Sequence, residues 1–201
     1  MEFRIIDISK DLITTEPYPG DPAPELSVFS SFAAGDSCNM ARLTTTLHCG
    51  THLDAPLHFI PGGKTVNSVP IDALIGECAV IEVDTERITG DYVDKFFPKS
   101  AERILINSGG KAYFDKTGAE ELSFIGCRLI GTDNNSVGCA EDQTGPHRAL
   151  LGEGVAVLEN LELKDVSPGK YFLAALPVKI AGVEAAPVRA VLLDGYVFWS
   201  K

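Results

Sequence analysis

The 201-residue sequence has no apolar run that approaches the roughly 20 residues of a transmembrane helix. Its N-terminal segment has an acid at position 2 and no basic stretch before an apolar one, so no secretory signal is predicted. Basic residues are scarce: 17 Lys and Arg stand against 28 Asp and Glu, which gives a formal net charge of −11. Because surfaces that bind nucleic acid or anionic membranes are basic, the composition argues against both partners.

The cysteines do not form a framework. They are odd in number, scattered and never in a C-x-x-C pair, and they lie at Cys38, Cys49, Cys78, Cys127 and Cys139. This pattern argues against a disulfide scaffold and a cysteine-rich zinc site, and it favours a reducing cytoplasm. No Ser-, Pro- or Gly-rich linker divides the chain, so we expect one domain over residues 1–201.

Short segments rich in β-branched and apolar residues dominate the chain and predict strands. The predicted strands are Phe3–Ile8, Leu26–Phe32, Leu43–Leu47, Cys78–Val83, Arg103–Ile106, Arg128–Gly131, Val155–Leu158, Tyr171–Ile180 and Val188–Phe198. Predicted helices are few: one turn at Ile71–Leu74, Tyr92–Phe97 capped by Thr89, and Pro146–Leu151 capped by Thr144. The clearest predicted loops are Gly62-Gly63, Gly109-Gly110 and Gly131–Gly145. The sequence therefore predicts a strand-rich α/β fold.

Histidine is rare in this chain, yet three of its four histidines, His48, His52 and His58, lie within eleven residues. Imidazole and carboxylate are ligands that zinc and similar divalent metals prefer, and Asp54 lies inside the cluster. Gly50 and Pro56 argue against a helix here, so the cluster is predicted on a strand end and a turn. Residues 48, 52 and 54 share parity, and an extended segment projects them to one side. The alternative is a solvated turn, or core histidines satisfied by backbone hydrogen bonds.

Two further candidates lie in the second half of the chain. His147 falls in the predicted helix Pro146–Leu151, and Glu159 ends the apolar segment Val155–Leu158. Taken alone, His147 is typical of a helix surface and Glu159 of a solvated strand end. Their spacing in the sequence does not connect them to the first cluster.

The segment His48–His58 fits the pattern H-x-G-T-H-x-D-x-P-x-H, and it resembles the putative cyclase family of metal-dependent hydrolases, which includes bacterial kynurenine formamidases. The resemblance extends over nearly the whole chain. It continues at Pro19-Gly20-Asp21, at Gly131-Thr132-Asp133 with Ser136, at His147–Leu151, at Leu158–Leu161, at Ala175-Leu176-Pro177 and at Pro187–Ala190.

The resemblance implies a role for every histidine. Residues matching His48, His52 and Asp54 hold one zinc ion in the formamidases, and residues matching Asp54, His147 and Glu159 hold a second. The residue matching His58 is the proton donor and acceptor. Two divalent ions per chain are therefore expected, zinc first and manganese as the alternative. The resemblance further implies an α/β domain of the swivelling β/β/α type, a small-molecule substrate, and a homodimer or higher homo-oligomer.

One position departs from the formamidases, which place a tryptophan against the aromatic substrate where this chain has Tyr18. The implied activity is hydrolysis of N-formylkynurenine by metal-activated water. Hydrolysis of a cyclic amide such as isatin, or of a lactone, is the enzymatic alternative, and Tyr18 packing on the protein's own surface is the structural one.

Two other classes of protein remain as alternatives. One is a non-catalytic metal-binding protein, which His58 argues against because a structural site needs no unligated base. The other is a thiol enzyme built on Cys49, whose side chain alternation directs away from the ligands.

Overall fold

The computed structural model describes residues 4–195, and its centre is a mixed sheet of eight strands in the order β1-β12-β11-β5-β7-β9-β10-β4. The sheet strands are β1 (Arg4–Asp7), β4 (His52–Asp54), β5 (Ile75–Glu82), β7 (Arg103–Asn107), β9 (Leu129–Thr132), β10 (Ala156–Glu159), β11 (Gly169–Pro177) and β12 (Ala185–Asp194). The short β4 pairs with both β10 and β12, so the sheet closes into a barrel and β1 is left outside on β12.

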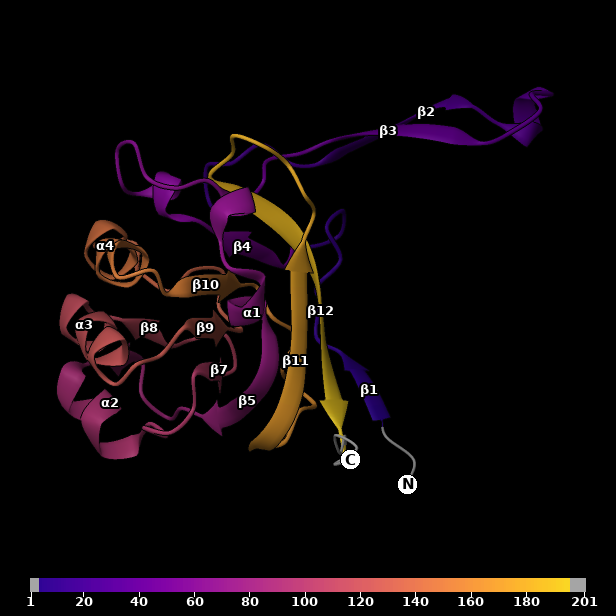
Figure 1. Ribbon diagram of the computed structural model, residues 1–201. Helices are drawn as coiled ribbons and strands as arrows, with labels where there is room; N and C mark the ends of the chain where they lie inside the picture. The colour runs from indigo at the N-terminus through magenta and orange to yellow at the C-terminus, as the bar shows by residue number, and fades with distance from the viewer. Residues whose placement is uncertain (1–3, 196–201) are drawn as a thin grey trace.

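Strands β5, β7, β9 and β10 are parallel, and helices connect them. The connecting helices are α2 (Gly90–Phe96), α3 (Lys116–Phe124) and α4 (Thr144–Gly152), and the single turn α1 (Ile71–Leu74) precedes β5. Figure 1 shows α2, α3 and α4 together on one side of these strands, opposite β11 and β12. None of the helices in residues 4–195 combines the length and apolar character needed to span a bilayer.

Alternation along the parallel strands divides the core in two. Leu105 packs with strands β11 and β12 in one cluster, whereas Ile104 and Ile106 pack against the helices in the other. Because both faces of these strands are buried, β7 has the nearly continuous apolar sequence that identified it as a strand.

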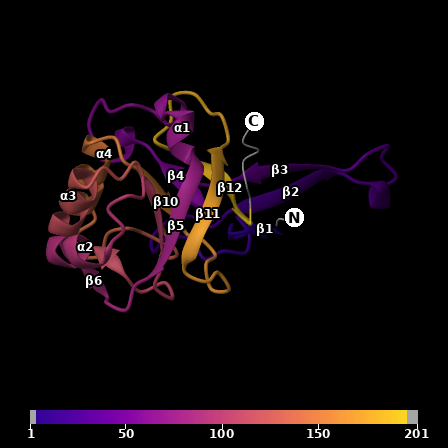
Figure 2. The same ribbon diagram turned by 60° about the horizontal axis from the view of Figure 1, so that its bottom comes forward.

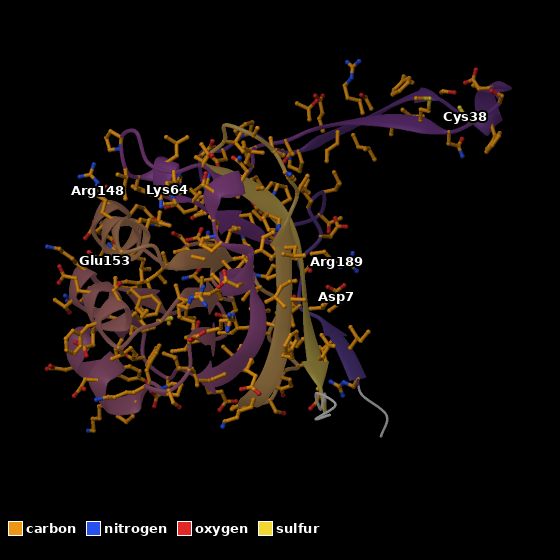
Figure 3. All side chains as sticks on the ribbon, viewed as in Figure 1. Asp7, Cys38, Lys64, Arg148, Glu153 and Arg189 are labelled. Atoms are coloured by element: carbon orange, nitrogen blue, oxygen red, sulfur yellow. The ribbon has the colours of Figure 1, made fainter. Side chains whose placement is uncertain are left out.

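A second, two-stranded sheet projects from the barrel. Among residues 4–195, strands β2 (Glu25–Ser30) and β3 (Met40–Thr44) pair only with each other, and the 3-10 turn Phe32–Ala34 joins them. Figures 1 and 2 both show this hairpin extending away from the rest of the chain. Figure 3 places Cys38 near its tip, far from the Asp7–Arg189 ion pair on the barrel.

The predicted strands are confirmed with shifted ends, apart from three corrections. β3 ends at Thr44, so residues 45–47 are not a strand, and β11 ends at Pro177 rather than at Ile180. Phe32 lies in the 3-10 turn, because Ser31 caps that turn by accepting from the Ala34 amide. Phe3 and the residues after Gly195 in the two terminal strand predictions lie outside the described residues.

The helix predictions are confirmed at Ile71–Leu74 and for α2, where Thr89 accepts from the Tyr92 amide. Thr144 is not a cap, which corrects the prediction: it is the first residue of α4, and Gln143 precedes it without a side-chain cap. Helix α3 and the two-stranded sheet of β6 (Arg87–Ile88) and β8 (Tyr113–Phe114) were not predicted.

Candidate metal centre

Pairing between β4 and β10 brings three of the predicted site residues together. The antiparallel register sets Glu159 opposite His52, and Asp54 opposite Val157. Because side chains alternate, His52, Asp54 and Glu159 lie on the same face of the sheet as Val157, which packs toward the helices. The shared orientation predicted for His52 and Asp54 agrees with this register.

His147 and His48 approach the same point from outside the sheet. His147 Nε2, on α4, lies 3.3 Å from Glu159 Oε1 and 3.6 Å from Asp54 Oδ2. His48 Nδ1, in the turn before β4, lies 3.2 Å from Asp54 Oδ1. His147 and Glu159 are almost fully buried, so the surface interpretation of each is wrong.

Two glycines allow the chain to present these side chains. Gly50, between His48 and His52, has a φ of +64°, and a Cβ there would lie 2.9 Å from the Leu12 Cα. A Cβ on Gly63 would lie 2.6 Å from the carbonyl carbon of Pro56, which opens the 3-10 turn that carries His58. Any larger residue at either position forces the backbone around the site to move.

The buried imidazoles are oriented by backbone carbonyls. His52 Nδ1 lies 3.0 Å from the Gly50 oxygen, and His147 Nδ1 lies 2.6 Å from the Gln143 oxygen. Because a carbonyl only accepts, each Nδ1 carries the hydrogen and each Nε2 is directed toward the carboxylates. This arrangement is typical of metal-binding histidines.

Four buried polar atoms at this point have no hydrogen-bond partner: His52 Nε2, His147 Nε2, Asp54 Oδ1 and Asp54 Oδ2. Buried polar atoms are normally satisfied, and leaving one without a partner costs about 1–3 kcal/mol. Two nitrogens and two carboxylate oxygens converging without partners fit a divalent cation, whose ligands they are by type.

The charges of the side chains agree with a cation position. Burial by itself lowers the pKa of His52 and of His147, but attraction by Asp54 and Glu159 outweighs it and raises these pKa values to about 9 and about 10. Burial raises the pKa of Glu159, yet the two histidines hold it at about 2. The protons on the histidines therefore balance the carboxylates, and a metal ion must displace them.

In the part of the chain that the structure describes, two groups of side chains have ligand atoms within 4.8 Å of one another: His52, Asp54 and Glu159, and His48, Asp54 and His58. Asp54 belongs to both, as expected of a bridging ligand. The groups differ from the implied sets, because His58 takes the place of His52 beside His48, and His147 lies outside both.

His58 lies at the half-exposed rim of the cluster. Its ring centroid is 4.2 Å from that of His48 and 5.6 Å from that of His147. Burial and the neighbouring His48 and His147 lower the pKa of His58 below its ordinary 6.5, although Asp54 opposes this. The ring is thus close to the buried ligands and neutral at pH 7.

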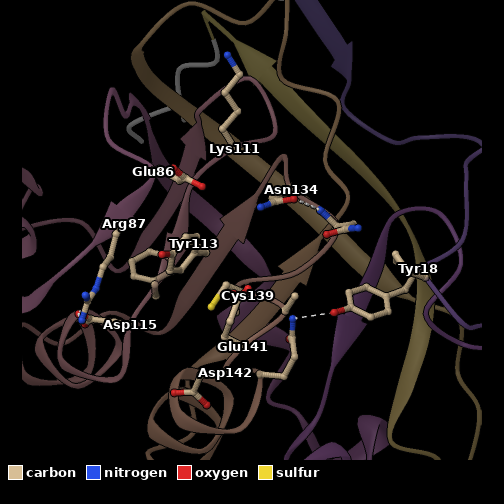
Figure 4. Close-up of a pocket in the computed structure, with 16 residues that line it drawn as sticks. Tyr18, Glu86, Arg87, Lys111, Tyr113, Asp115, Asn134, Cys139, Glu141 and Asp142 are labelled. Atoms are coloured by element: carbon tan, nitrogen blue, oxygen red, sulfur yellow. Dashed lines mark hydrogen bonds and ion pairs between the residues drawn. The ribbon is translucent and has the colours of Figure 1, made fainter.

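Tyr18 lies outside this cluster but is linked to it. Its hydroxyl accepts a hydrogen bond of 3.1 Å from Gln143 Nε2, which Figure 4 shows as a dashed line. Both residues line an open cavity of about 780 Å³ whose walls also include Lys111 and Cys139. Cys49 is buried and its thiol donates to the Leu12 carbonyl, which weighs against a thiol nucleophile.

Three residues near the site were not predicted as functional. Glu184 Oε1 lies 3.6 Å from His48 Nε2, and the Phe59 ring stacks on His147 at 4.2 Å. Gln143 contacts both Tyr18 and His147. For Glu184 the sequence holds no signal, since it lies 136 positions from His48 in the chain, whereas Gln143 precedes His147 by one helical turn.

Comparison with known proteins shows the family to which this chain belongs. The model of the family described as "Putative cyclase" matches residues 6–138. The chain belongs to the putative cyclase family. It is 37% identical to a kynurenine formamidase of Sphingopyxis alaskensis, covering 95% of this chain and 98% of the relative. It is 34% identical to a kynurenine formamidase of Salinibacter ruber, over 94% and 97% of the two chains.

Solved structures share the fold of this cyclase-family chain. A potential metal-dependent hydrolase with cyclase activity superposes with a TM-score of 0.81 at 27% identity, over 98% of this chain and 100% of the other. Isatin hydrolase A from Labrenzia aggregata, at 20% identity and a TM-score of 0.79, covers 96% of this chain and 94% of its own, and shows the shared fold. The cyclase-family chain is an enzyme, a metal-dependent amide hydrolase.

Proposed function

We propose that this enzyme hydrolyses N-formylkynurenine to kynurenine and formate. The observation that carries the proposal is the convergence of unpartnered, buried His52, Asp54 and His147 atoms in a chain 37% identical to a kynurenine formamidase. These residues fit a divalent metal, and metal-assisted hydrolysis needs such an ion beside a proton acceptor.

Two ions per chain are proposed, with zinc as the native metal and manganese as the alternative. His48, His52 and Asp54 would hold one ion, and His147, Glu159 and the shared Asp54 the other. The bridging role of Asp54 is supported by its membership of both ligand-distance groups and by its full burial. Imidazole and carboxylate are ligands that zinc and similar divalent metals prefer.

When bound, a divalent metal lowers the pKa of water from about 15.7 to about 7 and so supplies hydroxide at neutral pH. His58 would accept a proton from the attacking water and deliver it to the leaving nitrogen. Its position at the half-exposed rim supports this role, because an acid–base group must reach both substrate and water. The Phe59 ring lies beside both imidazoles, stacked on His147 at 4.2 Å and edge-on to His58 at 4.4 Å, and gives the site an apolar wall.

The assay compares turnover of N-formylkynurenine by the metal-loaded enzyme with turnover after a chelator and after metal is restored. We expect activity that is lost with the metal and returns with it. An enzyme that is fully loaded yet leaves N-formylkynurenine intact contradicts the proposed substrate.

Tyr18 is the reason to propose a cyclic amide such as isatin as a second candidate substrate. The tyrosine is smaller than the tryptophan of the formamidases, and its hydroxyl already bonds to Gln143. We expect Tyr18→Trp to raise the ratio of kcat/KM for N-formylkynurenine to kcat/KM for isatin. The change in this ratio should correspond to about 1–3 kcal/mol of activation free energy. An equal change for both substrates, measured in parallel, means that Tyr18 does not discriminate between them.

We also propose that the enzyme is a homodimer or higher homo-oligomer whose contact is the β2–β3 hairpin. Six large apolar side chains of the hairpin are 47–65% exposed, and they are Leu26, Val28, Phe29, Phe32, Met40 and Leu43. A two-stranded ribbon is marginal in water, and an apolar patch of this kind is typical of an interface. A second copy is the favoured occupant because the rest of the same chain offers further exposed apolar side chains, Ile13, Leu176 and Val178.

The proposal also covers the domain organisation, the fold type and the cellular location. One domain would span residues 1–201, and its type would be the swivelling β/β/α fold, supported by the helices gathered on one side of a closed mixed sheet. A cytoplasmic location is supported by five free thiols, three of them buried.

A further inference from the structure

Gln143 makes three polar contacts that run in different directions. Its side-chain amide donates to the Tyr18 hydroxyl at 3.1 Å, and its Oε1 accepts from the Ser136 hydroxyl at 2.7 Å. Its backbone oxygen accepts from His147 Nδ1 at 2.6 Å. One half-buried residue thus touches the Tyr18 loop and a buried ligand candidate at once.

Ser136 extends the connection to a second ligand candidate. Its hydroxyl oxygen lies 3.1 Å from Glu159 Oε1 as well as 2.7 Å from Gln143 Oε1, and it has a single proton to donate. The Val137 amide independently donates to Glu159 Oε1 at 2.7 Å. Glu159 therefore keeps the Val137 amide as a donor whichever acceptor takes the Ser136 proton. The position of the Gln143 amide oxygen sets how often the Ser136 hydroxyl donates to Glu159 instead of to Gln143.

We propose that Gln143 is a positioning residue that couples the Tyr18 loop to the metal ligands His147 and Glu159. The inference rests on the proposed metal site. Loss or movement of the Tyr18 hydroxyl shifts the Gln143 amide, which alters the bonds to Ser136 and, through the same residue's backbone, the orientation of the His147 ring. Groups that orient metal ligands in this way contribute about 10- to 100-fold to metal affinity or activity.

The test is a double-mutant cycle read out by metal affinity. Zinc dissociation constants are measured by competition with a chromogenic chelator, without substrate, for wild type, Tyr18→Phe, Gln143→Met and the double variant. Methionine keeps the length and the backbone carbonyl of Gln143 and removes only the amide. Glu141→Met, in the same loop, is the matched control and should bind zinc as wild type does.

We expect Gln143→Met to weaken zinc binding by about 10-fold and Tyr18→Phe to weaken it by a smaller factor. In the Gln143→Met background, Tyr18→Phe should add nothing, because the hydroxyl acts only through the amide. Effects that multiply independently, or zinc binding by Gln143→Met equal to wild type, overturn the proposal.

Two further measurements keep the test decisive. If Gln143→Met fails to fold by circular dichroism, Tyr18→Phe carries the test alone, and an unchanged zinc affinity overturns the coupling. With saturating zinc, Gln143→Met should lower kcat more than it raises KM, since positioned ligands act on the reaction rather than on substrate binding. Failure of the wild-type enzyme on N-formylkynurenine would refute the substrate, while the zinc cycle still decides the role of Gln143.

Discussion

At the scale of single residues, Asp54 is the side chain on which the two proposed ions depend. It is fully buried, and both its carboxylate oxygens lack hydrogen-bond partners. We expect Asp54→Ala to lose both ions on dialysis against a weak chelator, whereas Glu159→Ala should keep one, as measured by elemental analysis. Asp72→Ala, which removes an exposed carboxylate on α1, is the control. A wild-type protein that never holds more than one ion per chain contradicts the dinuclear site.

The position of His58 is compatible with two roles, metal ligand and proton carrier. It lies within ligand distance of His48 and Asp54, yet the resemblance to the formamidases implies a proton carrier. We expect His58→Ala to keep its full metal content while kcat falls by about 10²- to 10⁴-fold, the usual range for an acid–base group. Metal content and kcat are measured on the same preparation, and loss of metal would identify His58 as a ligand instead.

The sequence predicts the first half of the site because its residues are neighbours in the chain. His48, His52 and Asp54 fall within seven positions, and alternation alone orients the last two. Bringing His147 and Glu159 to the same point requires the pairing of β4 with β10, a contact between segments about 100 residues apart. Spacing carries no information on such contacts, and only the resemblance to the cyclase family connected the halves.

At the scale of elements, the longer strands were predicted more accurately than the short strand β4 and the helix α3. Runs such as β7 are apolar on both faces and bounded by polar residues, so their pattern is unambiguous. Strand β4 has three residues, too few for any period, and its pairing with both β10 and β12 defines it instead. Helix α3 has a clear start, where Asp115 accepts from the Gly118 amide, but Gly118 inside it obscures the helical pattern.

The hairpin of β2 and β3 forms a separate two-stranded sheet that projects from the barrel. We expect the double substitution Val28→Lys with Phe32→Lys to convert the oligomer to a monomer, because it places charge on side chains 64% and 65% exposed in the single chain. Light scattering after size-exclusion chromatography measures the mass. Ile71→Lys, at an equally exposed apolar position on α1, is the matched control and should remain oligomeric. A variant of unchanged mass, or a monomeric wild type, contradicts the proposed interface.

At the scale of the whole molecule, the proposed metal site lies where the barrel closes. Strand β4 is the only link between β10 and β12 among the described residues, and it carries His52 and Asp54. Its two neighbours belong to the parallel, helix-covered half and to the antiparallel half, respectively. The proposed ligands on β4, β10 and α4 would therefore hold the two halves of the sheet together through a shared ion.

Removal of the metal should accordingly destabilise the entire fold. Without an ion, the buried carboxylates of Asp54 and Glu159 depend on protons on His52 and His147 for charge balance, and four polar atoms are left without hydrogen-bond partners. A ligand present at 100 times its dissociation constant stabilises a protein by about 2.7 kcal/mol, and for a chain of this size each kcal/mol shifts the melting temperature by about 2–4 °C. We expect the metal-free enzyme to melt about 5–10 °C below the loaded one in differential scanning calorimetry. Asp54→Ala should show almost no such difference, because it no longer binds the ions. If wild type melts at the same temperature with and without metal, the site contributes nothing to closing the barrel.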